Sequence, residues 1–306
     1  MSNILLATEK PFAKEAVEKI RKVVESNKHR FILLESYTSK EELQLAINDI
    51  DALIIRSDLI DAEVINSGLQ LKIIVRAGAG YDNIDVQAAT NKNICVMNTP
   101  GQNANAVAEC CFGMMVFISR KQFDGSSGTE LRGKKLGILG YGNIGRFMGQ
   151  IGKGFGMDVF AYKRTPDPVA MRIDGVTPLS SFEEVFSLCD YVSLHIPAKQ
   201  DTVGAIDYKL LSLMPKNGVL VNTARQEIIN EADLIKIMQE RNDIKYISDF
   251  MPKNVETFKE SFGKRWFAPA KKMGAQTEEA NVNAGIAAAI QIINFLDKGD
   301  ETFRVN

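Results

Sequence analysis

Histidine is scarce in this chain of 306 residues, with only His29 and His195 present. Histidine is the side chain most often used for proton transfer near neutral pH and the commonest metal ligand, so this scarcity restricts both kinds of site. The four cysteines show no Cys-x-x-Cys spacing, and Cys110 and Cys111 are neighbours in an apolar helical pattern. We therefore interpret the cysteines as buried thiols and expect neither disulfides nor a metal site.

The sequence also lacks a long apolar run and an excess of charge of one sign. The longest apolar run, residues 110–118, is far shorter than a membrane span. Lys and Arg (37) nearly balance Asp and Glu (38), and there is no basic tail, so we expect no nucleic acid or membrane partner but a small-molecule one. The first residues lack the charged and apolar regions of a secretory signal, which favours a cytoplasmic protein.

What the sequence contains is a repeated alternation of short apolar runs and amphipathic helical stretches. This alternation predicts βα units that form parallel sheets with helices on both faces, which is the α/β class. A Gly/Ser-rich stretch at residues 124–128 interrupts the alternation, which restarts at residue 135. Because 306 residues exceed what one core usually serves, we expect two domains, with a last helix near residues 278–296 that returns to the first.

A G-x-G-x-x-G motif at residues 140–145 follows a predicted strand and opens a predicted helix. In this context Gly140 permits the tight turn, Gly142 lets the backbone approach a pyrophosphate, and Gly145 brings the helix close to the strand. Backbone amides near Asn143 and Ile144, at the helix N-terminus, would bind the phosphates. We predict a dinucleotide-binding loop here.

The choice between NAD and NADP depends on a position about twenty residues further on, where NAD enzymes usually carry Asp or Glu. This chain has Lys163 and Arg164 there. Two cations could pair with a 2′-phosphate, which favours NADP over NAD. The alternative is that both cations are merely solvated and NAD binds.

Four ordered segments resemble the D-2-hydroxyacid dehydrogenase family, at residues 75–85, 96–109, 128–131 and 221–225, and the last two resemble its phosphoglycerate dehydrogenases. The resemblance implies two Rossmann-like, doubly wound parallel-sheet domains with an interdomain cleft. Residues 1–100 plus 278–306 would form the substrate-binding domain and residues 101–277 the dinucleotide-binding domain. It also implies a homodimer and a short form without a regulatory domain.

The activity that this resemblance implies is oxidation of the C2 hydroxyl of 3-phosphoglycerate by a nicotinamide cofactor, the first step of serine biosynthesis. One alternative is an NADP-dependent hydroxypyruvate or glyoxylate reductase, which Lys163 and Arg164 would suit. An alternative of another class is a catalytically inactive, dinucleotide-sensing scaffold.

The resemblance also suggests roles for individual residues. Arg225 matches the catalytic arginine, whose guanidinium can contact the carboxylate and the keto oxygen together. Amides near Ala77 and Gly78 would hold the substrate carboxylate, and Arg56 and Arg76 are candidates for a substrate phosphate, with surface ion pairing as their alternative. On the cofactor side the resemblance places His195, Pro197, Thr223, Asp249 and Gly274.

The sequence departs from the family where the acid/base histidine is expected, because that register gives Lys272. An ordinary lysine, with a pKa of ~10.4, is a poor base at neutral pH, so Lys272 would need a lowered pKa from burial, Arg225 and the nicotinamide. The register of the family's partner carboxylate gives Asn254, and Glu256, two positions later, is left as a doubtful substitute. The alternative is a solvated Lys271-Lys272 pair in an enzyme that has lost activity.

Overall fold

The computed structural model describes residues 1–306 and divides them into two compact units. Unit 1 comprises Met1–Asn103 and Gln276–Asn306, and unit 2 comprises Ala104–Ala275. Unit 1 therefore also contains residues 101–103 and 276–277, which the sequence had assigned to the second domain. Thr277 belongs there because its Oγ1 accepts a hydrogen bond from the amide of Ala280 (3.1 Å) and so caps the last helix.

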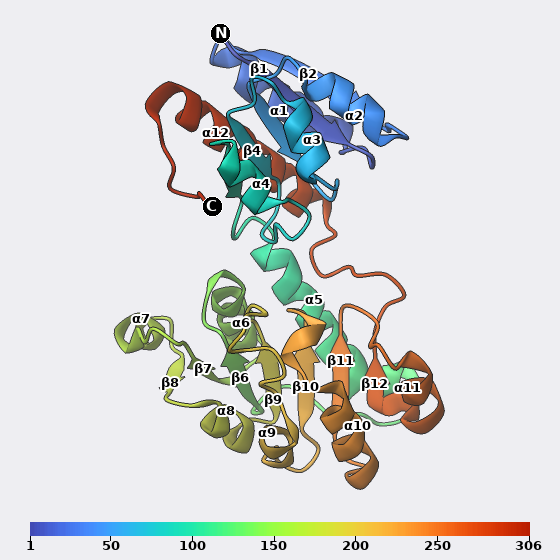
Figure 1. Ribbon diagram of the computed structural model, residues 1–306. Helices are drawn as coiled ribbons and strands as arrows, with labels where there is room; N and C mark the ends of the chain where they lie inside the picture. Colours follow the sequence, from blue (N-terminus) through green and yellow to red (C-terminus); the bar gives the residue numbers. More distant parts are fainter. The chain divides into compact units, whose positions relative to one another are not determined.

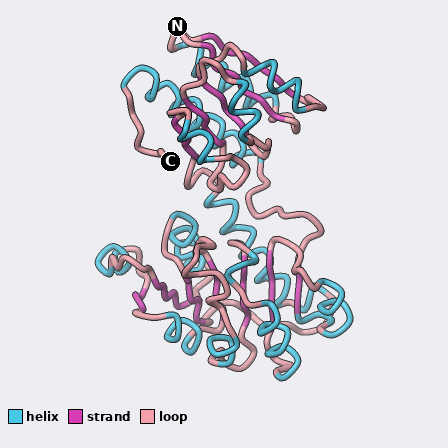
Figure 2. Tube along the Cα trace, in the orientation of Figure 1, coloured by secondary structure: helices cyan, strands magenta, loops and turns pink.

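Unit 1 is built on a five-stranded sheet in which every strand pair is parallel, with the order β2-β1-β3-β4-β5. This order is that of the flavodoxin-like doubly wound folds. Helices lie on both faces of the sheet (Figures 1 and 2). The elements are β1 (Asn3–Thr8), α1 (Lys14–Ser26), β2 (Arg30–Glu35), α2 (Lys40–Ile47), β3 (Ala52–Ile55), α3 (Ala62–Ser67), β4 (Ile73–Arg76), α4 (Val86–Asn91), β5 (Cys95–Asn98) and α12 (Glu278–Lys298).

The core of unit 1 has two layers because successive side chains of a strand point to opposite faces. Leu6 and Ile54 pack with α1 and α12 in one layer, whereas their neighbours Leu5 and Leu53 pack with α2 and α3 in the other. The strands are apolar on both faces, as expected of a parallel sheet covered by helices.

Unit 2 contains a seven-stranded parallel sheet with the order β12-β11-β10-β9-β6-β7-β8. Read from β8, this is the 3-2-1-4-5-6 order of the dinucleotide-binding Rossmann fold with one strand added. Its strands are β6 (Lys135–Leu139), β7 (Asp158–Tyr162), β8 (Thr177–Leu179), β9 (Tyr191–Leu194), β10 (Val219–Asn222), β11 (Lys245–Ser248) and β12 (Trp266–Phe267).

The helices of unit 2 cover both faces of this sheet. Its α-helices are α5 (Ala104–Ser119), α6 (Asn143–Gly154), α7 (Pro168–Ile173), α8 (Phe182–Leu188), α9 (Tyr208–Ser212), α10 (Glu231–Glu240) and α11 (Val255–Ser261), and short 3-10 turns occupy Lys121–Phe123, Gln226–Ile228 and Gly263–Arg265. Side chains of α5 and α6 pack on one face, and side chains of α8 to α11 pack on the other. No helix in the structure combines the length and apolar character needed to cross a bilayer.

The close approach of α12 to α1 in unit 1 depends on Gly285. A Cβ at this position would lie 2.6 Å from Ile20 Cδ1 and 3.3 Å from Phe12, and Ile20 is fully buried. We expect Gly285→Val to lower the free energy of unfolding by about 1–3 kcal/mol, because a branched side chain has no room there. Urea titration followed by circular dichroism measures the change. Asn283→Val, at an exposed position of the same helix, is the control, and equal stability of the two variants would contradict this packing.

Candidate active site

Parallel strands of unit 2 end at one edge of the sheet, and the predicted cofactor-side residues follow these ends directly. In the strand register, Leu139 of β6 pairs with Leu194 of β9, which pairs with Asn222 of β10, which pairs with Ser248 of β11. The residues that come next after these four ends are Gly140, His195, Thr223 and Asp249. The structure thus brings four predicted positions from distant parts of the chain to one edge.

The three glycines of the loop between β6 and α6 have three different environments. Gly140 has φ 105°, and a Cβ there would lie 2.6 Å from the carbonyl oxygen of His195. A Cβ at Gly145 would lie 2.5 Å from the carbonyl oxygen of Gly140, whereas a Cβ at Gly142 would meet open space. The loop therefore fits a dinucleotide: the turn and the helix–strand contact both require glycine, and the backbone at Gly142 is open to an approaching phosphate.

Tyr141, inside the same loop, was not singled out from the sequence. Its side chain is buried, and its hydroxyl donates to Asp174 Oδ2 (2.9 Å), just after α7. Burial raises the pKa of Tyr141, so the phenol stays protonated and anchors the loop as a donor. In the sequence, the only sign of this anchor was an aromatic residue between the first two glycines of the motif.

At the end of β7, the two cations that bear on cofactor choice differ in environment. Lys163 is half-buried and Arg164 is exposed. Arg164 Nη2 forms an ion pair with Asp201 Oδ2 at 2.7 Å. The guanidinium charge is thus partly offset where a 2′-phosphate was expected to pair with it.

His195, after β9, is held as a neutral ring. Its Nε2 lies 2.8 Å from Ser193 Oγ, and its Nδ1 is shielded from solvent without a partner. Desolvation lowers the pKa of His195 to about 3, so the ring is uncharged near neutral pH. Pro197 follows two positions later, and its carbonyl accepts from Thr202 Oγ1 (2.6 Å).

The two predicted catalytic cations meet at one backbone carbonyl. Arg225 Nη1 donates to the carbonyl oxygen of Ala224 at 3.0 Å, and Lys272 Nζ donates to the same oxygen at 3.5 Å. Lys272 Nζ also lies 5.3 Å from the centre of the Phe250 ring, within cation–π range. Lys272 is exposed and Arg225 is half-buried.

Asn222, the last residue of β10, organises the loop that carries Arg225. It is fully buried; its Oδ1 accepts from the amide of Ala224 and its Nδ2 donates to the carbonyl of Arg225, both at 3.0 Å. Thr223 points elsewhere, with its Oγ1 3.3 Å from Cys111 Sγ. Asn222 was not singled out from the sequence, although a polar residue at the end of the apolar strand Val219–Asn222 was a signal that could have indicated it.

Asp249 holds the segment that carries Lys272. Its Oδ2 accepts from the amide of Gly274 (2.9 Å), and its carbonyl accepts from the amide of Met273 (3.3 Å). A Cβ at Gly274 would collide with that carboxylate, which explains the glycine. Burial raises the pKa of Asp249, while Lys272 and Arg225 act against the rise, and its Oδ1 is buried without a partner. An unpartnered buried oxygen fits an acceptor for an amide donor of a ligand.

The two positions considered for a partner carboxylate lie near α11. Glu256 is exposed and pairs with Lys259 at 2.9 Å. Asn254 donates to Glu231 through its amide N–H (2.6 Å) and its side chain (2.8 Å). These contacts connect neither residue to the carbonyl of Ala224.

In unit 1, the two arginines considered for a substrate phosphate are linked. Arg56 Nη2 donates to Asn281 Oδ1 (2.6 Å), and its guanidinium lies 4.8 Å from the centre of the Phe12 ring. Arg76 Nε donates to the carbonyl of Arg56 (3.0 Å). Neither contact is a surface ion pair.

The amides expected to bind a substrate carboxylate are already hydrogen-bonded inside unit 1. Ala77 N–H donates to the carbonyl of Ile55, and Gly78 N–H donates to that of Arg76, both at 2.8 Å. Gly78 has φ 156°, and a Cβ there would collide with Arg76 Nη1. The structure thus gives this loop a role in seating Arg76 and leaves neither amide free as a carboxylate donor.

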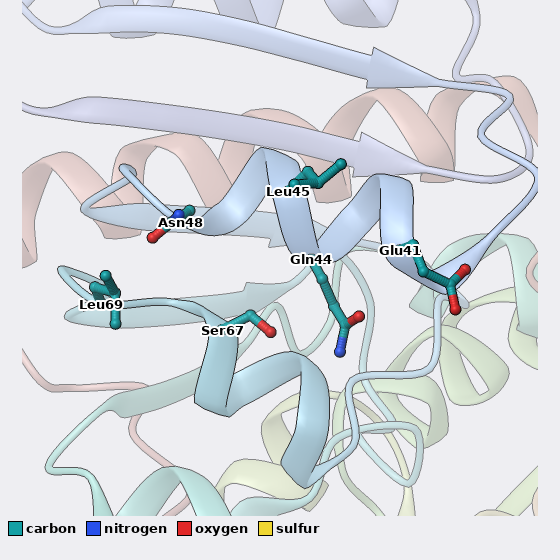
Figure 3. Close-up of a pocket in the computed structure, with 6 residues that line it drawn as sticks. All are labelled: Glu41, Gln44, Leu45, Asn48, Ser67 and Leu69. Carbon is teal, nitrogen blue, oxygen red and sulfur yellow. The ribbon is translucent and has the colours of Figure 1, made fainter.

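A surface hollow of about 490 Å³ on unit 1 lies apart from these motifs. It is lined by Glu41, Gln44, Leu45, Asn48, Ser67 and Leu69 (Figure 3). In Figure 3, Gln44 from α2 and Ser67 from α3 extend toward the same space, whereas Leu45 points away from it. The lining holds one ionisable group and no opposing cation, so we assign no chemistry to it. The structure also contains no group of three or more His, Cys, Asp or Glu side chains suited to a metal ion.

Comparisons with known proteins agree with this geometry. Residues 106–269 match the family described as D-isomer specific 2-hydroxyacid dehydrogenase, NAD binding domain. The crystal structure of a cofactor (NAD+)-bound 3-phosphoglycerate dehydrogenase from Entamoeba histolytica is 46% identical, with a TM-score of 0.89, over 100% of this chain and 98% of that one.

Curated relatives show the same likeness. D-3-phosphoglycerate dehydrogenase from Sus scrofa is 34% identical over 84% of this chain and 51% of its own length. Hydroxypyruvate reductase from Thermotoga maritima is 35% identical over 73% of this chain and 75% of its own length. The chain spans about half the length of the curated phosphoglycerate dehydrogenases that it matches. On the strength of the matched nucleotide domain and these relatives, the chain belongs to the D-isomer specific 2-hydroxyacid dehydrogenase family.

Proposed function

We propose that this protein transfers a hydride between C2 of 3-phosphoglycerate and a nicotinamide cofactor, the reaction that opens serine biosynthesis. The observation that carries the proposal is the meeting of Arg225 and Lys272 at the carbonyl of Ala224, on the sheet edge that also bears the dinucleotide loop. The similarity to the Entamoeba histolytica 3-phosphoglycerate dehydrogenase, 46% over the whole chain, supports the substrate. The homodimer, the cytoplasmic location and the substrate-binding role of unit 1 stay predictions.

The two cations have separate tasks in this proposal. The planar guanidinium of Arg225 would hold the carboxylate and the C2 oxygen of the substrate, where two parallel hydrogen bonds fix orientation. The amine of Lys272 would give a proton to the C2 oxygen when a keto acid is reduced and take it back in the oxidation. Both charges also stabilise negative charge that develops on that oxygen.

Residues at the sheet edge would hold the cofactor, which supplies hydride transfer when bound. The open backbone at Gly142 and the first amides of α6 would bind its pyrophosphate. The Oδ1 of Asp249, which has no partner in the structure, would accept a hydrogen bond from the carboxamide of the cofactor. This contact would keep the nicotinamide ring beside Arg225 and Lys272. Gly274 supports this by bonding the other carboxylate oxygen.

The phosphate of the substrate is assigned to the arginines of unit 1. Arg56 carries a guanidinium that is fixed by a neutral partner, Asn281, and by the face of Phe12. Neither of these two partners is charged, but the buried carboxylate of Asp58 also acts on the guanidinium, and a substrate phosphate would bind in its presence. Arg76 is tied to Arg56 through its backbone carbonyl.

For the cofactor we propose NAD as the preferred dinucleotide. The ion pair between Arg164 and Asp201 places a carboxylate beside the cation on which the NADP prediction depends. A 2′-phosphate would have to displace or tolerate that carboxylate. Lys163 still favours NADP, so the preference is expected to be modest.

A second candidate activity is reduction of hydroxypyruvate or glyoxylate with NADPH. Lys163 and Arg164 favour it, and so does the 35% identity to the Thermotoga maritima hydroxypyruvate reductase. An inactive dinucleotide-sensing scaffold is the third, and Arg225 and Lys272 at one carbonyl argue against it, because a scaffold needs no such pairing.

Substrate preference tests these candidates directly. We expect the highest kcat/KM with phosphohydroxypyruvate, because Arg56 and Arg76 add a phosphate contact that hydroxypyruvate and glyoxylate cannot make. A panel of 2-keto acids with NADH and NADPH, followed at the absorbance of the reduced cofactor, measures this. Higher kcat/KM with glyoxylate would favour the second candidate, and absence of turnover with every acid would favour the third.

Removal of the amine at Lys272 tests the acid/base assignment. We expect Lys272→Ala to lower kcat by roughly 10²–10⁴-fold, the usual contribution of a positioned acid/base group. The dissociation constant of NADH should change little, since Lys272 bonds a backbone carbonyl and not the dinucleotide loop. Lys271→Ala, which removes the neighbouring exposed amine, is the matched control. Equal turnover in the two variants would remove Lys272 from the mechanism.

The role of Asp201 in cofactor choice predicts a change in preference. Asp201→Asn should raise the ratio of kcat/KM for NADPH to that for NADH about two- to fivefold, because exposed charge pairs contribute up to about 1 kcal/mol. Asp201→Glu keeps the charge and should leave the ratio near that of the original protein. A ratio that does not differ between Asn and Glu at this position would show that Arg164 does not face the cofactor.

A further inference from the structure

We infer that Asn222 is a positioning residue that aims the carbonyl of Ala224 at both Arg225 and Lys272 and so sets the spacing of the two cations. This inference rests on the proposed function, because it concerns the same two side chains. Asn222 itself is fully buried and lies behind the loop. It acts on the reaction only through the backbone.

The geometry of three consecutive peptide groups carries the argument. Asn222 Oδ1 accepts from the N–H of Ala224, which belongs to the peptide group between residues 223 and 224. Asn222 Nδ2 donates to the carbonyl of Arg225, which belongs to the peptide group between residues 225 and 226. The carbonyl of Ala224 belongs to the peptide group between these two. Because peptide groups are planar and only two torsions join each pair, pinning both neighbours fixes the direction of the middle carbonyl.

That middle carbonyl is where the cations converge. Its oxygen accepts from Arg225 Nη1 at 3.0 Å and from Lys272 Nζ at 3.5 Å. A carbonyl oxygen has two lone pairs and can accept both donors. Two like charges at one site repel each other, so a shared acceptor with partial negative charge lowers the cost of holding them together.

Asparagine is one of the few residues whose side chain can make both of these hydrogen bonds to the loop. One amide group supplies an acceptor and a donor, two bonds in opposite senses to atoms one residue apart. An Asp would keep the acceptor but lose the donor, and a Leu would lose both and leave Ala224 N–H and the Arg225 carbonyl without this partner. Serine can accept from the amide two residues on, but more weakly.

The anchoring of the neighbouring strand supports the same view. Ser248, the register partner of Asn222 on β11, donates its hydroxyl to the carbonyl of Phe250 at 2.5 Å. Phe250 is the residue whose ring lies under Lys272. A second contact of Lys272 is therefore also set by a buried polar side chain at a strand end.

The test compares Asn222→Ala and Asn222→Ser with Asn230→Ala, which removes the exposed cap of α10 in the same unit. We expect kcat to fall about 10²-fold in Asn222→Ala, the scale of a small misplacement of catalytic groups, and to recover in part in Asn222→Ser. The dissociation constant of NADH, measured through the single tryptophan, should stay within about twofold, as expected of a site that the substitution does not touch. Asn230→Ala should keep its kcat.

A double-mutant cycle separates positioning from a general loss of order. If Asn222 acts through the cations, Asn222→Ala should reduce kcat less in the Lys272→Ala background than in the original protein. Fully additive effects, a parallel loss of NADH binding, or a kcat no lower than that of Asn230→Ala would overturn the inference. If Asn222→Ala does not fold, Asn222→Ser carries the test, and failure of both to fold would assign Asn222 a structural role instead.

A readout without turnover distinguishes failure of this inference from failure of the proposed function. Reductive ¹³C-methylation of lysines gives a resonance for Lys272, identified by its absence in Lys272→Arg. In Asn222→Ala this resonance should report greater mobility of the Lys272 side chain, whereas in Asn230→Ala it should not. An unchanged resonance would overturn the inference even in an active enzyme, and a changed one would support it even if no 2-keto acid is turned over.

Discussion

Parallel pairing in the seven-stranded sheet is the constraint on which the site depends. All its strands run in one direction, so their carboxyl ends lie at one edge, and the strands themselves are apolar on both faces. No strand can therefore carry chemistry in its interior. Gly140, His195, Arg225 and Asp249 each lie one to three residues beyond a strand end, where side chains first leave the core.

The loops at that edge need their own backbone partners, and buried polar side chains supply them. Ser193, Asn222 and Ser248 are fully buried at the last or next-to-last position of β9, β10 and β11. Each reaches a group two residues further along: Ser193 bonds the ring of His195, Asn222 the amide of Ala224, and Ser248 the carbonyl of Phe250. An unpaired polar group at such depth costs about 1–3 kcal/mol, so these side chains stabilise the loops and also fix their shape.

The sequence was informative wherever a local pattern determines structure. The α/β class followed from alternating periodicity, and the structure confirms two parallel-sheet units. The glycine loop is in the predicted context, because each glycine responds to atoms that are close in the chain or in the next strand. Lys272 was found only through a family register, since no local rule marks an exposed lysine.

The features of the site that the sequence did not indicate depend on contacts between residues distant in the chain, which periodicity does not encode. Lys163 and Arg164 favour NADP in the sequence, and the contact of Arg164 with Asp201, on another loop, is visible only in the structure. The amides of Ala77 and Gly78 proved to be bonded to backbone carbonyls, one of them on the neighbouring strand β3. Asn222 was visible as a polar strand end, but its effect on two cations required the positions of Ala224 and Lys272.

In the proposed mechanism a lysine takes the place of the histidine that the family resemblance leads us to expect, and this changes how the acid/base group can be held. An imidazole is oriented by a hydrogen bond that its second nitrogen donates, commonly to a carboxylate, whereas an amine has one nitrogen on a flexible stem. Lys272 contacts the carbonyl of Ala224 and the face of Phe250, and its charge also interacts with the carboxylate of Asp249. A carboxylate in direct contact would favour the ammonium more strongly and hinder proton release. Asn254, which stands where the family resemblance leads us to expect a carboxylate, would add no further negative charge beside the proposed acid/base group.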